Sequence, residues 1–279
     1  MRSLLMITFT LFFSQIVAFP AFSQALEESD PLQYADIVDL SSEAPIIVNV
    51  VIKDAIKIDP ERAPNAPAGT QRFYIIASTS ALIRGQGGVG ETIRYVIDLP
   101  LDGRGRAPKI EKKPFIIFAR RPSGGSIDDV QLVAKDAQIA WTPSREQRVR
   151  SVVRELVARD APPAISKIAS AFHVPGTILG EGETQIFLET DTGTPISITV
   201  LTRDGQRKFW AVSLGEIVDE AARAPVRNSL LWYRLACFLP RQLPAPALAG
   251  DTLANAQRAR NDYQTVLDDL GSCPRSRQP

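Results

Sequence analysis

Five segments rich in β-branched and aromatic residues lie between Pro45 and Trp141, separated by Gly- and Pro-rich turns, and they constrain the fold more than any other feature. Short strands at such regular spacing are typical of an all-β barrel or sandwich. In the second segment apolar side chains occupy both faces, with Phe73 and Ile75 on one and Tyr74 on the other. The expected strands are residues 46–58, 72–83, 92–99, 114–120 and 130–141.

Five strands of this spacing fit a small closed barrel, and the pattern resembles that of the oligonucleotide/oligosaccharide-binding (OB) fold, although no motif carries the resemblance. A helix should close the barrel. Thr142-Pro143-Ser144 is a typical helix start, and apolar residues then recur at helical spacing from Val149 to Val157. We therefore assign residues 45–160 to a β-barrel-like domain with a closing helix.

The breaker Ala161-Pro162-Pro163 marks the start of an α+β domain, residues 161–240. Three alternating segments there predict a β-meander. Two helices should follow it, a short one over residues 217–222 after a capping box of Ser213 and Glu216, and another over residues 227–239, which Pro240 ends. The segments are residues 183–190, 195–202 and 207–212.

Residues 241–279 are expected to form a Pro/Ala-rich linker, a C-terminal helix that ends at Gly271, and a tail that is disordered from Pro274. The predicted fold class is therefore mixed β and α+β: a five-stranded small barrel, a helix, then a β-meander plus helices.

The first 25 residues are typical of an export signal. Arg2 precedes an apolar stretch that starts at Leu4, and Ser23-Gln24-Ala25 provides the small residues of a cleavage site. Cleavage there would leave an acidic leader, residues 26–44, on a periplasmic or secreted protein without a further membrane span. A retained N-terminal membrane anchor is the alternative, because the apolar character continues to Phe22.

Export also affects the interpretation of the two cysteines, Cys237 and Cys273, because an oxidising compartment permits a disulfide between them. Two unpaired thiols are the alternative. A simple helical hairpin would leave the two cysteines far apart, so a bridge requires the last helix to cross the body of the protein.

Charge and composition exclude several classes of function. The formal net charge is +1, so no global field favours nucleic acid as a partner. With one histidine and two cysteines, the chain cannot supply a multi-histidine or multi-cysteine metal site, and we predict no metal or cofactor. The stretch Gly85 to Gly90 satisfies G-x-G-x-x-G, but a strand follows it instead of the helix that a dinucleotide needs. We interpret it as a glycine-rich hairpin.

His173 is the one side chain that can act as an imidazole base near neutral pH, and Glu181 and Glu183 follow it closely. It is therefore a weak catalytic candidate for a periplasmic hydrolase. No G-x-S-x-G elbow or S-x-x-K pair supports that chemistry. The alternative is a partly exposed histidine at the end of a strand.

A local basic excess provides the candidate ligand-binding residues. Between Arg94 and Arg121 the cations outnumber the carboxylates by five, and aromatic residues are interleaved with them, as expected of a face that binds an anionic ligand. A solvated loop is the alternative. The candidates are Arg94, Arg104, Arg106, Lys109, Lys112, Lys113, Arg120 and Arg121.

These observations favour an exported, non-enzymatic binding or structural protein that recognises a protein or an anionic envelope component through residues 94–121. The hydrolase based on His173 is the second hypothesis. An inhibitor or scaffold held by the disulfide is the third.

Overall fold

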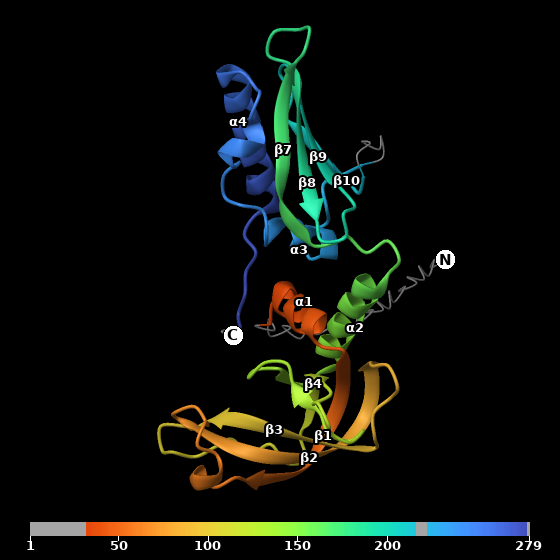
Figure 1. The fold of residues 1–279 in the computed structure, drawn as a ribbon, viewed down its shortest axis with the longest axis vertical. Coiled ribbons are helices and arrows are strands. Elements are labelled where there is room, and N and C mark those ends of the chain that lie inside the picture. The colour runs from red at the N-terminus through yellow and green to blue at the C-terminus, as the bar shows by residue number, and fades with distance from the viewer. Residues whose placement is uncertain (1–31, 216–221, 278–279) are drawn as a thin grey trace, which may run out of the picture. The chain divides into compact units, whose positions relative to one another are not determined.

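The computed structural model describes residues 32–215 and 222–277, and residues from Leu32 onward group into one compact unit (Figure 1). The expected signal peptide, its cleavage site and the first part of the acidic leader lie outside the described residues, as do residues 217–221 of the short helix expected over 217–222. The remainder of that leader forms helix α1 (Tyr34–Glu43), which buries Ile37, Val38 and Leu40. This acidic segment is therefore part of the core as well as of the surface.

A nearly closed antiparallel barrel follows, which confirms the expected N-terminal fold. Its strands pair in the order β3-β2-β1-β4-β5, with β6 also on β4. Arg94 on β3 pairs in parallel with Asp129 just before β5, and this contact brings the two ends of the sheet together. The strands are β1 (Ile46–Lys57), β2 (Thr70–Arg84), β3 (Thr92–Pro100), β4 (Pro114–Arg120), β5 (Gln131–Leu132) and β6 (Gln138–Ala140), with a 3-10 turn η1 at Pro60–Arg62.

The inside of the barrel is apolar because alternate residues of each strand point inward. Phe73, Ile75 and Ala77 of β2 are buried there with Ile93 and Tyr95 of β3. The single fifth strand expected over 130–141 was wrong in one respect. Residues 134–136 form a turn that is closed by Ala137 N–H donating to the Ala134 carbonyl, while Val133 and Ala137 stay hydrogen-bonded to Phe118 of β4, so the strand divides into β5 and β6.

Helix α2 (Pro143–Val157) follows the barrel, and the Thr142 hydroxyl caps it by accepting from the Arg145 amide. It packs against α1 and α3 (Leu230–Ala236), and its buried residues belong to the main core and not to the barrel interior. The second sheet is a meander in the order β10-β9-β8-β7. It contains one more strand than the alternation predicts, because two bulges interrupt the period of β7. The strands are β7 (Ile165–Pro175), β8 (Gly182–Thr190), β9 (Ile196–Thr202) and β10 (Phe209–Ser213).

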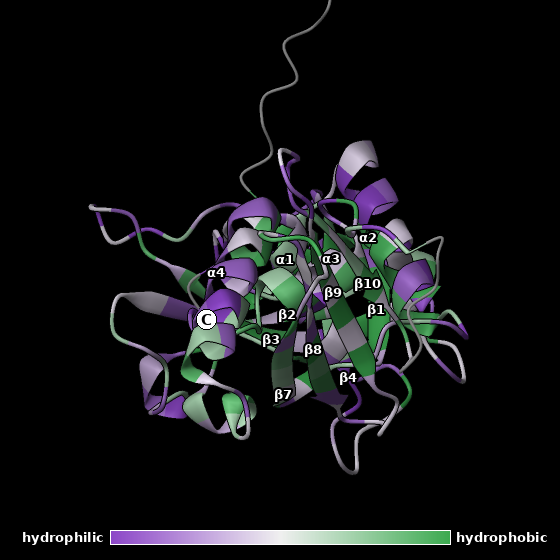
Figure 2. Ribbon diagram, turned by 90° about the horizontal axis from the view of Figure 1, so that it is seen from above, coloured by the Kyte–Doolittle hydropathy of each residue, from purple (hydrophilic) through white to green (hydrophobic). Residues whose placement is uncertain are grey.

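The main hydrophobic core combines α1 and α2 with the outer faces of β1 and β4, the second sheet and the C-terminal helices. Those helices are α3 (Leu230–Ala236), the 3-10 turn η2 (Ala245–Leu248) and α4 (Leu253–Leu270). Helix α4 packs on β7, β8 and β9, and it meets α3 near its end, where Trp232 donates its indole N–H to the Leu270 carbonyl. Hydrophobic residues follow the strands and hydrophilic ones the loops (Figure 2).

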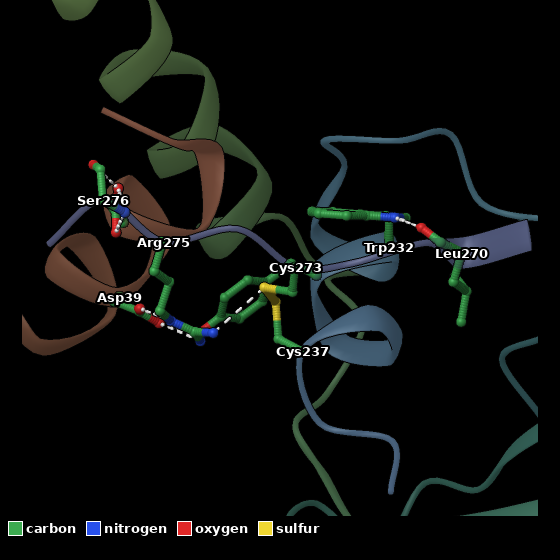
Figure 3. Close-up of a disulfide and its surroundings, with 9 residues drawn as sticks. Asp39, Trp232, Cys237, Leu270, Cys273, Arg275 and Ser276 are labelled. Atoms are coloured by element: carbon green, nitrogen blue, oxygen red, sulfur yellow. Dashed lines mark hydrogen bonds and ion pairs between the residues drawn. A yellow bond between two sulfur atoms is a disulfide. The ribbon is translucent and has the colours of Figure 1, made fainter. Parts of the chain in front are cut away.

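The Cys237–Cys273 disulfide is present, with the two Cα atoms 5.2 Å apart (Figure 3). The expected disorder of the tail was wrong for residues 274–277, because ion pairs hold them in place. The Arg275 guanidinium donates to Asp39 of α1 at 2.8 Å, and Arg277 donates to Asp136 with two bonds of 2.7 and 2.9 Å. The tail therefore fastens the last helix to the first one.

Asp36 of α1 is the most heavily hydrogen-bonded carboxylate in this contact. It is fully buried and accepts from the Ser276 amide and hydroxyl, from the Arg277 amide and from the Gln33 amide. Burial alone would raise the pKa of Asp36, but the hydrogen bonds from Ser276, Gln33 and Arg277 to the charged form lower it below its usual value. The tail is thus held by a charged carboxylate.

Removing the disulfide should destabilise the protein. The bridge closes a loop with a sequence separation of 36 residues, for which the chain-entropy model predicts a stabilisation of about 4 kcal/mol. We expect the double variant Cys237→Ser/Cys273→Ser to lose about that much free energy of unfolding in urea titrations. The reduced wild-type protein is the matched control, and it should lose a similar free energy of unfolding. An unchanged unfolding midpoint in both would contradict the prediction.

Replacing Asp36 should reduce the sensitivity of the fold to acid. Because the folded pKa of Asp36 is lowered, its stabilisation is present above the unfolded value of about 4 and is lost as the pH falls through the folded pKa. Asp36→Asn should therefore cost about 2 kcal/mol at neutral pH, with a shallower loss of stability on acidification. Urea unfolding from neutral to acidic pH measures both. If the free energy of unfolding falls with pH in the same way for the variant and the wild type, Asp36 makes no pH-dependent contribution to stability.

Candidate functional site

The structure divides the eight basic candidates into two groups at opposite ends of β4. Because β4 has seven residues, the groups are separated by about 20 Å. One group follows β3 in the connection to β4 and contains Arg104, Arg106, Lys109, Lys112 and Lys113. The other group surrounds the β4–β5 connection and contains Arg94, Arg120 and Arg121.

Local partners occupy half of these cations. Arg94 forms an ion pair with Asp129 at 3.0 Å, and Arg106 pairs with Asp102 at 3.1 Å. Arg121 donates to the carbonyls of Ile127 and Gly88. Arg120 donates to the Gln131 side chain, whereas Arg104 and the three lysines have exposed side chains with no partner among the described residues. The eight residues therefore do not form one continuous basic face.

A groove of about 590 Å³ lies on the outer face of β2 and β3, and only Arg94 among the candidates lines it. Its floor is a ladder of cross-strand pairs in which Arg72 faces Asp98 and Tyr74 faces Val96. Its wall is the segment from Pro122 to Lys135, which covers β5 and the loops on either side of it. The sequence pattern made Arg94 a candidate, but it did not identify Arg72 or Tyr74 as site residues. No local pattern showed that the segment around Asp129 would lie beside β3.

The groove combines an apolar floor with fixed charged groups. Val96 is 46% exposed, and Tyr74 lies beside it. Arg72 donates to both oxygens of Asp98, at 2.7 Å each, so the guanidinium is held flat. The hydrogen bonds that Arg72 donates to Asp98 raise the pKa of Arg72 above its usual value. Lys135 is exposed at the rim with no partner among the described residues.

His173 lies on β7 within a buried polar cluster, so the expectation of a partly exposed histidine at a strand end was wrong. Its side chain is 2% exposed. Thr184 is its cross-strand neighbour on β8, and the Thr184 hydroxyl lies 2.9 Å from His173 Nδ1. The same hydroxyl donates to Asp262 of α4, and Lys208 donates to the other oxygen of Asp262 at 2.6 Å.

This arrangement determines which nitrogen of His173 carries a proton. The Thr184 hydroxyl has one hydrogen and donates it to Asp262, so it can only accept from His173. We assign the Nδ1–H tautomer from this network. In the neutral ring Nε2 then has a free lone pair, and Nε2 is buried with no hydrogen-bond partner among the described residues.

A cavity of about 300 Å³ opens beside this cluster, between α4 and the end of the second sheet. Gly182 leaves room for the imidazole, because a Cβ at that position would lie 2.6 Å from both Nε2 and Cε1 of His173. The lining residues are His173, Gly180, Thr202, Lys208, Arg258, Asn261 and Asp262.

Comparisons with known proteins identify no relative: no protein-family model matches the sequence, and neither does any curated protein. Among the described helices, none is long and apolar enough to cross a membrane. The functional interpretation therefore depends on the sites themselves.

Replacing Gly182 should disturb the His173 cluster. In Gly182→Ala the new methyl group would contact the hydrogen-bonded imidazole and, at 2.9 Å, the Val174 carbonyl, and neither group can move freely. We expect a loss of about 1–3 kcal/mol in the free energy of unfolding. Gly103→Ala is the matched control, because a methyl group at position 103 would have no atom within 4 Å. Equal stability of the two variants in urea would contradict the prediction.

Proposed function

We propose that this protein is an exported, non-enzymatic binding protein that holds an acidic oligosaccharide of the cell envelope in the groove on β2 and β3. The observation that carries the proposal is the groove of about 590 Å³ over the Tyr74–Val96 pair. Small OB-type barrels bind oligonucleotides and oligosaccharides on this part of the sheet, beside the loop between their last two strands. This barrel is similar to OB-type barrels in fold alone. The choice of ligand therefore depends on the side chains of the groove.

The side chains suit a sugar ring. Tyr74 and Val96 offer an apolar surface for the C–H face of the ring, and the tyrosine hydroxyl is available for hydrogen bonding. Arg72 and Asp98 hold each other in place, so their remaining donors and acceptors are pre-positioned for hydroxyl groups.

The charge of the groove favours an acidic ligand. Arg72, Arg94 and Lys135 are three cations against the two carboxylates Asp98 and Asp129, which leaves one net positive charge. Lys135 provides it, because both arginines are in ion pairs with these carboxylates. One unpaired lysine is a weak attractant for a polyphosphate backbone, so the groove suits a sparsely charged glycan better than a nucleic acid.

Export to the periplasm or the cell exterior is supported by two observations in combination. Residues 1–25 have the pattern of a signal peptide, and the Cys237–Cys273 disulfide is stable only where thiols become oxidised.

The buried cluster around His173 favours binding over hydrolysis. The hydroxyl bonded to His173 belongs to Thr184, which is fully buried and already donates to Asp262. That hydroxyl is out of reach of a substrate. It therefore cannot be the nucleophile of a hydrolase in which His173 activates a hydroxyl group.

The proposal is tested in calorimetric titrations with hyaluronan oligomers, which carry one carboxylate for every two sugars, with a neutral dextran oligomer and with single-stranded DNA. We expect the acidic oligosaccharide to bind best, and Tyr74→Ala and Lys135→Glu each to weaken it about tenfold. Lys109→Glu makes the same charge change on the barrel away from the groove and should have little effect.

Other results would overturn it. If Lys109→Glu weakens the binding of the acidic oligosaccharide and Lys135→Glu does not, the ligand binds on the β3–β4 connection. Tighter binding of DNA than of the acidic oligosaccharide would show that the ligand class is wrong. No binding of either would remove the groove as a ligand site.

A further inference from the structure

We infer that the cavity beside His173 is a second binding site, which takes a small oxyanion such as phosphate or sulfate. It belongs to the second sheet and α4, so it does not depend on the function proposed for the barrel groove. The two sites have no lining residue in common.

Two buried polar atoms at this cavity lack a partner. His173 Nε2 and Thr202 Oγ1 are both buried without a hydrogen bond among the described residues. Thr202 pairs with Gly182 across β8 and β9, and the imidazole lies over Gly182, so the two atoms belong to the same corner of the cavity. Buried polar atoms in folded proteins are almost always hydrogen-bonded, so this corner is built to receive a polar group.

The charges of the lining identify that group as an anion. Lys208 and Arg258 are cationic, and Asp262 is the one carboxylate that lines the cavity among the described residues. Asp262 is already bonded by Lys208 and Thr184, so it is shielded from an incoming anion. Arg258 is exposed on α4 and has no partner in the described part of the chain, which leaves its guanidinium available for a bidentate contact.

His173 would make binding depend on pH. With Nδ1–H donating to Thr184, protonation of Nε2 converts its lone pair into a donor that points to the anion. The charged groups near the ring are Asp262 and Arg258 on α4, Asp251 just before α4 and Lys208 before β10, with Asp204 close to Gly180 at the rim. No described carboxylate is within hydrogen-bond distance of His173 Nε2 or of the Thr202 hydroxyl, so the imidazolium would face the bound anion there.

The experiment measures sulfate binding to the purified protein by calorimetry at about pH 5.5 and about pH 8. Sulfate keeps its charge over this range, so a change in affinity reports a change in the protein. We expect tighter binding at the lower pH. Arg258→Gln should weaken it about tenfold. Arg260→Gln is the matched control on the same helix, because positions 258 and 260 point to different faces.

The histidine has its own test. In His173→Asn the affinity for sulfate should no longer change with pH, and circular dichroism verifies that this variant folds. A further arm compares inorganic phosphate with glucose 6-phosphate. Equal affinity would identify the free ion as the ligand, and tighter binding of the ester would identify a phosphorylated small molecule.

Three results would overturn the inference. One is the absence of sulfate and phosphate binding by a folded wild-type protein. Another is equal weakening by Arg258→Gln and Arg260→Gln, which would reduce the effect to nonspecific charge. The third is a pH dependence that persists in His173→Asn, which would exclude the proposed role of the imidazole.

Discussion

The contact between α1 and the C-terminal tail is the constraint on which the rest of the structure depends. Ile37, Val38 and Leu40 of α1 are buried in the main core, while Asp36 and Asp39 accept hydrogen bonds from the tail. The Cys237–Cys273 bridge holds the base of that tail against α3. Residues near the two ends of the described chain therefore meet at this contact. The elements between them form one compact unit.

This closure also positions α4, and through it the cavity beside His173. The Trp232 indole bonds the last carbonyl of α4, and the disulfide follows three residues later. At the other end of the helix, Asp251 accepts from the His173 amide. The helix is therefore fixed at both ends along the sheet, which brings Asp262 against Thr184 and Arg258 to the rim of the cavity. The barrel groove is positioned separately, by the pairing of β2 with β3 and by Arg94 contacting Asp129.

Errors in the sequence interpretation occurred where a regular pattern was interrupted. The alternation of apolar and polar residues does not predict β7, because two bulges in β7 change which residues point inward. The fifth barrel segment does not continue as one strand, because residues 134–136 form a turn between two residues, Val133 and Ala137, that both bond to Phe118 of β4. The eight basic candidates are close in sequence, but they lie at the two ends of β4, and their role in ligand binding stays a prediction.

The sequence by itself determined the first four barrel strands, the helix after Thr142 and the end of α4 at Gly271. The alternation of apolar residues in strands, the capping of helices and the backbone freedom of glycine each depend on residues a few positions apart. They can therefore be recognised from short stretches of sequence. The groove, the His173 cluster and the ordered tail were decided by the tertiary structure. Each joins side chains distant along the chain, such as Thr184 with Asp262 and Ser276 with Asp36, and no local pattern encodes which of them will meet.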